Sequence, residues 1–341
     1  MNRFNPNRLF GLAGLVGLIV TSVIVTSVVA QQTDPGSQPP AARPDLPFGP
    51  AALAAQAARF KAWLQAAPSG SGPYGTVREE FSGLPDQTVF RPAKLNDLKG
   101  KMPVVAFGNG GCRNTPVEFT AFLAEIASRG YFVVAAGTDD VEFAGMNLSG
   151  NSANGKPLQV VTRTVLTSGV DWAIRQNSER RGPFAGKITT DKIAYMGQSC
   201  GGMQALSAST DPRTTTTVVL NSGRFAKDMK APAGGAFSEW FEWSELHAPI
   251  AYFAGGPSDV PTAHQNYPEI TSLPVFLADL PVGHTGAYPG PDMRWVKAVA
   301  SWLDWQLKGD RASGAMFVGP KCGLCTDPDW TVTGSKNLKT P

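Results

Sequence analysis

The segment from Gly197 to Gly201, which reads Gly-Gln-Ser-Cys-Gly, restricts the fold of this chain more than any other stretch. The mostly apolar residues 192–196 precede it and the small residues 201–208 follow it, so the sequence predicts a buried strand, a tight turn and a helix. To expose its hydroxyl, Ser199 has to adopt a strained backbone conformation in that turn. The strand and the helix then approach each other so closely that neither Gly197 nor Gly201 has room for a side chain.

Strand and helix patterns alternate along the chain from residue 103 onwards. Runs of β-branched and aromatic residues predict further strands at 104–107, 131–136, 217–220, 249–254 and 274–278. Apolar residues at helical spacing predict helices at 116–129, 160–175 and 293–307. This alternation favours an α/β fold with a mainly parallel, doubly wound sheet covered by helices on both faces. Two short strand patterns, at 76–81 and 87–90, predict an antiparallel hairpin at the N-terminal edge of that sheet.

The N-terminal region follows a different pattern. Two arginines, Arg3 and Arg8, precede an apolar run over 9–29, and small residues close that run at 28–30. This pattern predicts a secretory signal peptide over residues 1–30, although the run is also long enough to be a retained membrane anchor. We therefore expect the protein to be secreted or periplasmic.

The remainder of the chain is expected to form one domain over residues 51–341, after a flexible Pro-rich spacer at 31–50. It begins with an Ala-rich helix at 51–67, and a hydrophobic content of 42% is enough to bury a sizeable core. The net charge of +3 is spread along the sequence without a Lys/Arg cluster, so we expect no nucleic-acid partner. We also expect a monomer, with no stable membrane partner once the signal peptide is removed.

A serine hydroxyl becomes a strong nucleophile with a general base, an acid that orients the base, and donors for the developing oxyanion. Doubly wound sheets place their sites in loops at the carboxyl ends of strands. Of the three histidines, His284 lies in a Gly-flanked loop directly after the last predicted strand, which favours it as the base. His264 falls in a predicted helix after Pro261, and His247 precedes a strand and so belongs to the opposite end of the sheet.

Two aspartates are candidates for the orienting acid. Asp259 lies in the Gly-rich turn 255–259, immediately after the strand at 249–254. Asp279 lies five residues before His284, on the same strand end. We favour Asp259, for which the other interpretation is an ordinary turn or helix-capping aspartate.

The candidate oxyanion donors are backbone amides beside the serine and in the loop 108–112. Cys200 follows Ser199 at the start of the predicted helix, where backbone N–H groups and the positive end of the helix dipole lie. The loop reads Gly-Asn-Gly-Gly-Cys, and its glycines allow the backbone to approach a substrate carbonyl. The second donor is expected to be the N–H of Gly110 or Gly111; the alternative is a plain flexible turn.

Four motifs together resemble the α/β-hydrolase superfamily over roughly residues 74–309: the Gly-Gln-Ser-Cys-Gly elbow, the Gly-Asn-Gly-Gly loop, the Gly-Gly-Pro-Ser-Asp turn and the Gly-His-Thr-Gly loop. In these motifs the chain is most similar to secreted esterases of the dienelactone-hydrolase, cutinase and polyester-hydrolase kind. The resemblance implies Ser199 as nucleophile, Asp259 as orienting acid and His284 as base, and it implies no cofactor.

The sequence departs from those esterases near the candidate oxyanion loop, where Asn109 stands in the place of a histidine. If the fold is that of the superfamily, the loops that carry Cys112 and Cys200 are neighbours, and we expect a disulfide that fixes the oxyanion donors. Cys322 and Cys325 form a C-x-x-C pair. A zinc site would need two further ligands, so we expect a small local disulfide there and no metal.

The residues that contact the substrate are less well determined. The segment 224–246 interrupts the alternation of strands and helices and is a candidate cap over the site. Its aromatic residues fit either a substrate contact or core packing. The candidate substrate contacts are Trp240, Trp243, Met203 and Tyr288; Phe237 and Phe241 are further aromatic residues of the cap segment.

The sequence therefore predicts a secreted serine hydrolase that cleaves carboxylic esters through an acyl-enzyme. A peptidase or an acyltransferase on the same fold is one alternative, and a non-catalytic secreted binding protein is another. The acyl group, the alcohol and the size of the substrate, small or polymeric, stay open.

Overall fold

The computed structural model describes residues 58, 62, 69–139, 162–227, 239–259, 261–285, 288 and 292–340. The expected signal peptide, the spacer and almost all of the expected helix at 51–67 lie outside these described residues. All described residues belong to one compact unit, residues 45–341. None of the helices in the described part of the chain is long and apolar enough to cross a membrane.

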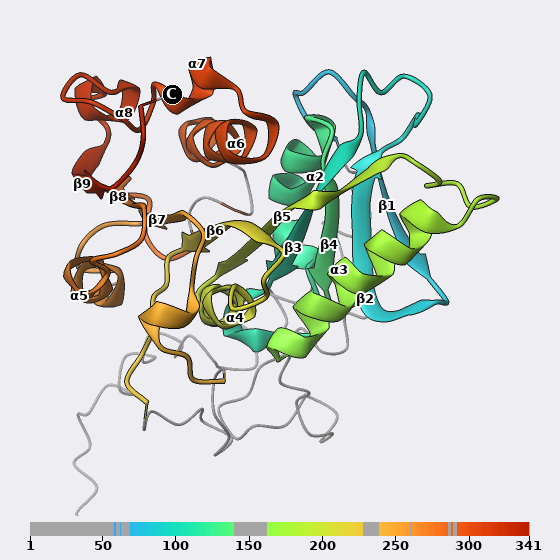
Figure 1. Ribbon diagram of the computed structural model, residues 1–341, viewed down its shortest axis with the longest axis horizontal. Helices are drawn as coiled ribbons and strands as arrows, with labels where there is room; N and C mark the ends of the chain where they lie inside the picture. The colour runs from blue at the N-terminus through green and yellow to red at the C-terminus, as the bar shows by residue number, and fades with distance from the viewer. Residues whose placement is uncertain are drawn as a thin grey trace, which may run out of the picture. The chain divides into compact units, whose positions relative to one another are not determined.

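One sheet organises the described residues (Figure 1). Its strands are β1 (Thr76–Phe81), β2 (Leu84–Pro92), β3 (Met102–Gly108), β4 (Phe132–Ala136), β5 (Ile188–Gln198), β6 (Thr214–Leu220), β7 (Ile250–Ala254), β8 (Val275–Asp279) and β9 (Thr331–Lys336). They lie side by side in the order β1-β2-β4-β3-β5-β6-β7-β8-β9. The strands from β4 to β8 in this order are parallel, whereas β1, β2 and β9 pair antiparallel with their neighbours. The predicted mainly parallel α/β sheet and its N-terminal edge hairpin are confirmed.

Helices cover both faces of this sheet (Figure 1). One face carries α2 (Thr120–Ser128) and α6 (Met293–Lys308). The opposite face carries α3 (Arg163–Ser178), α4 (Cys200–Ala208) and α5 (Pro261–Glu269). Since both faces are covered, the central strands are apolar throughout rather than alternating, as β3 and β4 show.

Successive residues of the central strands belong to different hydrophobic clusters. In β3, Val105 and Phe107 pack into the cluster beneath α2 and α6, whereas Val104 and Ala106 pack beneath α3 and α4. This division follows from the two-residue period of a strand. The central strands are therefore supported from both faces of the sheet by closely packed cores.

The structure differs from the predicted elements mainly at the C-terminal end. Strand β9 was not predicted, because its sequence, Thr-Val-Thr-Gly-Ser-Lys, has one apolar residue and looks like a loop. It pairs with β8 as an edge strand, with alternate residues exposed, so it needs little hydrophobic content. Two short helices, α7 (Arg311–Gly314) and α8 (Gly323–Thr326), precede it. The hairpin turn is also tighter than predicted, since β2 begins at Leu84.

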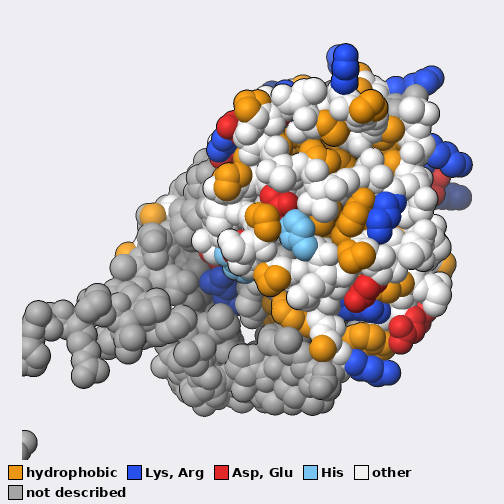
Figure 2. Space-filling model, turned by 90° about the vertical axis from the view of Figure 1, so that its left-hand side faces the viewer, with side chains coloured by type: hydrophobic (Ala, Val, Ile, Leu, Met, Phe, Trp, Pro, Cys, Tyr) orange, Lys and Arg blue, Asp and Glu red, His pale blue; other side chains and the backbone are white. Residues whose placement is uncertain are grey.

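Charged side chains of both signs are interspersed on the face drawn in Figure 2, with hydrophobic side chains between them. Their distribution agrees with the sequence, in which Lys and Arg are not clustered.

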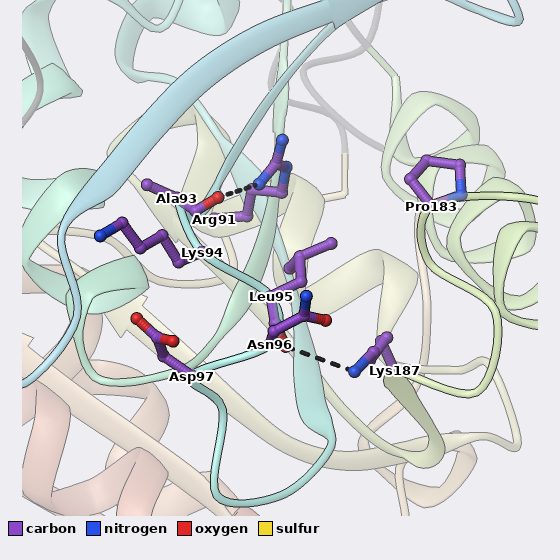
Figure 3. Close-up of a pocket in the computed structure, with 8 residues that line it drawn as sticks. All are labelled: Arg91, Ala93, Lys94, Leu95, Asn96, Asp97, Pro183 and Lys187. Atoms are coloured by element: carbon purple, nitrogen blue, oxygen red, sulfur yellow. Dashed lines mark hydrogen bonds between the residues drawn. The ribbon is translucent and has the colours of Figure 1, made fainter.

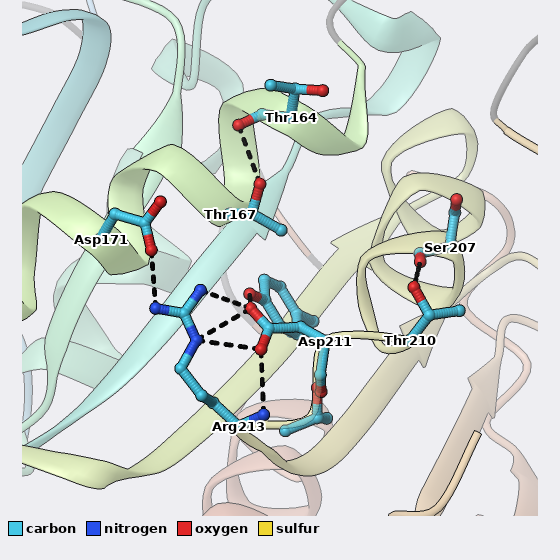
Figure 4. Close-up of polar contacts among 9 residues, drawn as sticks. Thr164, Thr167, Asp171, Ser207, Thr210, Asp211 and Arg213 are labelled. Atoms are coloured by element: carbon cyan, nitrogen blue, oxygen red, sulfur yellow. Dashed lines mark hydrogen bonds and ion pairs between the residues drawn. The ribbon is translucent and has the colours of Figure 1, made fainter. Parts of the chain in front are cut away.

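A polar network ties α3 to the turn between α4 and β6, at the amino ends of the parallel strands. Arg213 donates to Asp171 at 2.6 Å and to Asp211 at 2.5 Å (Figure 4). The buried hydroxyl of Tyr195 donates to the same Asp211 carboxylate at 2.8 Å. Burial opposes the ionisation of Asp211, but the hydrogen bonds from Arg213 and Tyr195 outweigh it and lower the pKa of Asp211.

We expect the variant Asp211→Asn to lower the free energy of unfolding at pH 7 by about 2 kcal/mol, because hydrogen bonds to a charged group are lost. The folded-state pKa of Asp211 lies below its unfolded value, so this stabilisation is present above about pH 4 and is lost as the pH falls through the folded-state pKa. Denaturant unfolding of both proteins at pH 7 and pH 3 measures the effect. If the two proteins differed in free energy of unfolding by the same amount at both pH values, this expectation would be contradicted. The control is Asp191→Asn, a substitution at an exposed aspartate.

Candidate active site

Ser199 sits in a sharp turn between β5 and α4 at the carboxyl end of the central strand. Its backbone angles are φ 54° and ψ −121°, a region that residues with a side chain rarely occupy. The two glycines explain how the turn is accommodated. A Cβ atom on Gly201 would lie 2.0 Å from the carbonyl oxygen of Gly108, and one on Gly197 would lie 2.2 Å from the carbonyl oxygen of Gly201. The strained serine and the close approach predicted from the sequence are both present.

Three side chains from separate loops form a continuous chain of contacts. His284, in the loop after β8, has Nε2 2.9 Å from Ser199 Oγ. Its other ring nitrogen, Nδ1, lies 3.3 Å from Oδ1 of Asp259, in the turn after β7. With the proton on Nδ1, the imidazole can donate to the carboxylate and accept the serine proton. The histidine side chain is 44% exposed and the aspartate 16%, so the site is open to solvent on the side of the base.

The competing residues lie elsewhere. Asp279 ends β8, is 2% exposed, and has Oδ1 3.1 Å from Nε2 of His264 on α5. Burial raises the pKa of Asp279, although the neighbouring imidazole opposes this effect. His247 contacts the carbonyl oxygen of Thr214, the first residue of β6, at the opposite end of the sheet.

Two further side chains at the site were not predicted from the sequence. Asn221, directly after β6, donates from Nδ2 to Oδ2 of Asp259 at 3.0 Å and to the carbonyl oxygen of Gly283 at 3.3 Å. Gln198, directly before Ser199, donates from Nε2 to the carbonyl oxygen of His284 at 2.9 Å. The only signal in the sequence is that each polar residue lies at the carboxyl end of a predicted strand.

The expectation that Tyr288 contacts the substrate is not met. Its side chain is 1% exposed and packs edge-on against Phe119, Phe122 and Trp295 in the core beneath α2 and α6. Its hydroxyl donates to Oδ1 of Asn221 at 2.7 Å. Through Asn221 the tyrosine hydroxyl is thus linked to Asp259, and its ring belongs to the core.

The glycine loop after β3 lies against the turn that holds Ser199. Gly110 to Cys112 form one turn of 3₁₀ helix, in which Gly111 has φ 65°. Gly110 is buried and Gly111 is exposed. Asn109 anchors the loop: its Nδ2 donates to the carbonyl oxygens of Ala136 and Arg113. The Asn109 side chain therefore holds the loop in place.

The cysteines form two pairs at disulfide distance. The Cα atoms of Cys112 and Cys200 are 5.1 Å apart, which joins the glycine loop to the first residue of α4. The Cα atoms of Cys322 and Cys325 are 4.9 Å apart. Both pairings agree with the predicted ones. Within the described part of the chain, no three His, Cys, Asp or Glu residues are grouped closely enough to hold a metal ion.

The other candidate substrate contacts divide into two groups. Met203 packs with Cys112, Cys200 and Phe225 in a small apolar cluster beside the turn that holds Ser199. Trp240 and Trp243 instead stack on the guanidinium of Arg224, whose Cζ lies 4.6 Å and 4.1 Å from their ring centroids. Phe241 is buried beneath α5, and residues 228–238, with Phe237, lie outside the described residues. Core packing thus accounts for Phe241, whereas Trp240 and Trp243 are half-buried and bind a cation. Phe225 is a neighbour of Ser199's turn that the sequence did not indicate.

A separate open pocket of about 490 Å³ lies at the other end of the sheet (Figure 3). It is lined by Arg91, Ala93, Lys94, Leu95, Asn96, Asp97, Pro183 and Lys187. Its lining comes from the end of β2, which is antiparallel to β4, from the loop after β2 and from the segment before β5. It therefore faces away from the carboxyl ends where sites of such sheets form. Lys187 donates to the carbonyl oxygen of Leu95.

No protein-family model matches this chain, and none of the curated proteins compared with it matches. Its function has therefore to be inferred from the geometry of the site itself.

Proposed function

We propose that this protein is a secreted serine hydrolase of the α/β-hydrolase fold that cleaves carboxylic esters. The observation that carries the proposal is the contact chain from Ser199 Oγ through His284 to Asp259. These residues follow β5, β7 and β8 in the chain order nucleophile, acid, base, the order of α/β-hydrolases. The strained conformation of the serine supports the same assignment, since strain of this kind is retained at functional sites.

In the proposed mechanism, Ser199 Oγ attacks the ester carbonyl carbon while His284 Nε2 takes the hydroxyl proton. Asp259 keeps the Nδ1 proton in place and stabilises the imidazolium that forms. When the tetrahedral intermediate collapses, His284 passes its proton to the departing alcohol. Water then attacks the acyl carbonyl carbon while His284 Nε2 takes a proton from it. When this second tetrahedral intermediate collapses, the carboxylic acid leaves and His284 returns the proton to Ser199 Oγ. Each step uses side chains of this chain and requires no cofactor.

The oxyanion is proposed to be bound by two backbone amides. As the first residue of α4, Cys200 has an N–H for which the helix itself provides no acceptor. In the facing loop, the exposed Gly111 is a better candidate than the buried Gly110. Removing one such donor typically costs about 3 kcal/mol of transition-state stabilisation.

Hydrolysis of p-nitrophenyl esters of graded acyl length tests the proposal, with a polyester film and a peptide p-nitroanilide measured beside them. We expect turnover of the esters with an initial burst of about one p-nitrophenolate per chain where deacylation limits the rate. Preference for the anilide would indicate a peptidase. A folded protein that turns over none of these substrates would overturn the assignment as a hydrolase.

We further propose that Cys112 and Cys200 are bonded and hold the two oxyanion amides in register. The double variant Cys112→Ser, Cys200→Ser removes a cross-link between residues 88 positions apart. We expect its free energy of unfolding to fall by about 4.5 kcal/mol and its kcat to fall about tenfold. The matched control replaces Cys322 and Cys325, three residues apart; it should lose about 2 kcal/mol and keep its kcat.

Mass mapping without reduction identifies the bonded pairs directly, and steady-state kinetics of the two double variants compare their effects on kcat. Finding Cys112 and Cys200 as free thiols in the secreted protein would contradict the proposed bond. A variant lacking this pair that folds and retains full kcat would contradict its link to the oxyanion.

A further inference from the structure

The hydrogen bonds behind the candidate acid form a buried chain that the proposed mechanism does not use. Asn221 is 1% exposed, and its amide joins Asp259 on one side to Tyr288 on the other. Its backbone N–H donates to the carbonyl oxygen of Phe253 at the end of β7, the strand that precedes the acid. We propose that Asn221 and Tyr288 are positioning residues that set the orientation of Asp259 for proton transfer; this inference rests on the proposed function.

The backbone of Asn221 provides the first indication. Its φ is 47°, in the left-handed region that favours glycine, although asparagine tolerates it better than most residues. Glycine would satisfy the backbone at this position without strain. The hydrogen bonds of the Asn221 side chain therefore explain why an asparagine occupies this position.

The orientation of the Asn221 amide is fixed from both ends. Nδ2 faces two acceptors, the Asp259 carboxylate and the carbonyl oxygen of Gly283, so only the NH₂ group fits on that side. Burial, followed by the negative charges of Asp259 and Glu118, raises the pKa of Tyr288 well above its ordinary value. The tyrosine hydroxyl thus stays protonated and donates to Oδ1, which prevents the amide from turning over.

The two carboxylate oxygens of Asp259 are thereby given separate partners. Oδ2 accepts from the Asn221 amide and Oδ1 faces Nδ1 of His284. The same amide also binds Gly283, the residue before the base, so one side chain holds the loops of the acid and the base together. Gly283 is further held by its N–H, which donates to Gly255 at 3.0 Å.

The charged and titratable groups around these hydrogen bonds lie after β8 and before α2. His284 faces Asp259 from the loop after β8, and Tyr288 lies behind it. Glu118, which precedes α2, acts on the tyrosine from a greater distance and is paired with Arg113. The neutral amide of Asn221 lies between Tyr288 and Asp259. Replacing this amide with a carboxyl group therefore adds a single titratable group to these surroundings.

Asn221→Gly tests positioning by the split between kcat and KM. We expect this variant to fold with a lower unfolding midpoint, because the loss of three buried hydrogen bonds outweighs the relief of backbone strain, and to lose about 30-fold in kcat with KM within twofold. Tyr288→Phe keeps the ring and should lose about fivefold in kcat. Its matched control is Tyr131→Phe, which deletes another buried hydroxyl, bonded to Asp304, and should leave kcat unchanged.

In Asn221→Asp, the positioning role predicts a change in the pH dependence of kcat that a purely structural role would not produce. At low pH the new carboxyl is protonated and can donate to Asp259 as the amide does, whereas at high pH two like charges lie about 3 Å apart. The ratio of its kcat to that of the wild type should therefore fall by more than tenfold from pH 5.5 to pH 9. A ratio that is independent of pH would overturn the inference.

The failure of this inference can be distinguished from the failure of the proposed function. If the wild type hydrolyses esters while Asn221→Gly and Tyr288→Phe both retain its kcat, the positioning role is wrong and the hydrolase stands. If the folded wild type hydrolyses no ester, both are wrong. The proton on His284 Nδ1 gives a readout without turnover: its downfield NMR signal should be present in the wild type and lost in Asn221→Gly, and its persistence there contradicts the inference.

Discussion

Replacing Ser199 with alanine is expected to lower kcat for ester hydrolysis by about 10⁴- to 10⁶-fold, because the nucleophile and its covalent intermediate are lost. The fold should survive, since the serine hydroxyl is half-exposed and its contact is with the exposed base. Steady-state kinetics of the purified variant measure the loss. A folded Ser199→Ala protein that keeps a tenth of the wild-type kcat would show that another residue performs the chemistry.

Ser199→Gly is the informative companion to that variant. Glycine occupies φ 54° and ψ −121° readily, so removing the strain should raise the free energy of unfolding by about 1 to 3 kcal/mol while activity is lost. Alanine at the same position keeps the strain and should unfold close to the wild type. Denaturant unfolding of the three proteins tests this order of stability, and a glycine variant that is less stable than the alanine variant would contradict it.

Gly201→Ala is expected to destabilise the fold by more than about 5 kcal/mol, which for many domains prevents folding. The new Cβ would lie 2.0 Å from the carbonyl oxygen and 2.1 Å from the carbonyl carbon of Gly108. Both atoms belong to the backbone of β3, in the middle of the sheet, so neither can move aside as a flexible side chain would. Soluble expression and unfolding of the variant measure the effect.

Gly75→Ala provides the control for this experiment. It lies just before β1, and a Cβ there would meet no atom within 4 Å. Its stability should change by less than about 1 kcal/mol. If Gly201→Ala proved as stable as Gly75→Ala, the close contact between α4 and β3 would not exist in solution.

The parts of the fold that the sequence predicted are those with the strongest local patterns. Strands β3 and β4 are predicted by their runs of apolar residues, and α6 is predicted by the helical spacing of its apolar residues. The polar edge strand β9 does not, because it is held by backbone pairing with β8 rather than by buried side chains. Pairing between segments more than 50 residues apart leaves no local signal.

The candidate site was predictable in part for the same reason. Ser199 is marked by its glycines, and Asp259 and His284 each follow a recognisable strand in a Gly-rich loop. Asn221 also follows a strand, but a polar residue at that point has many uses, and its partners come from two other loops. Tyr288 is buried in the core, but a tyrosine in a loop gives no sign in the sequence of whether its ring turns toward solvent or inward.

Fluorophosphonate labelling followed by mass analysis tests the central claim most directly, since it reports an activated serine without assuming any substrate. We predict a single covalent adduct on Ser199, no adduct in Ser199→Ala, and slower labelling in Asp259→Asn, in which the imidazole loses its anionic partner. A folded wild-type protein that takes up no label, or that carries it on a different residue, would contradict the account.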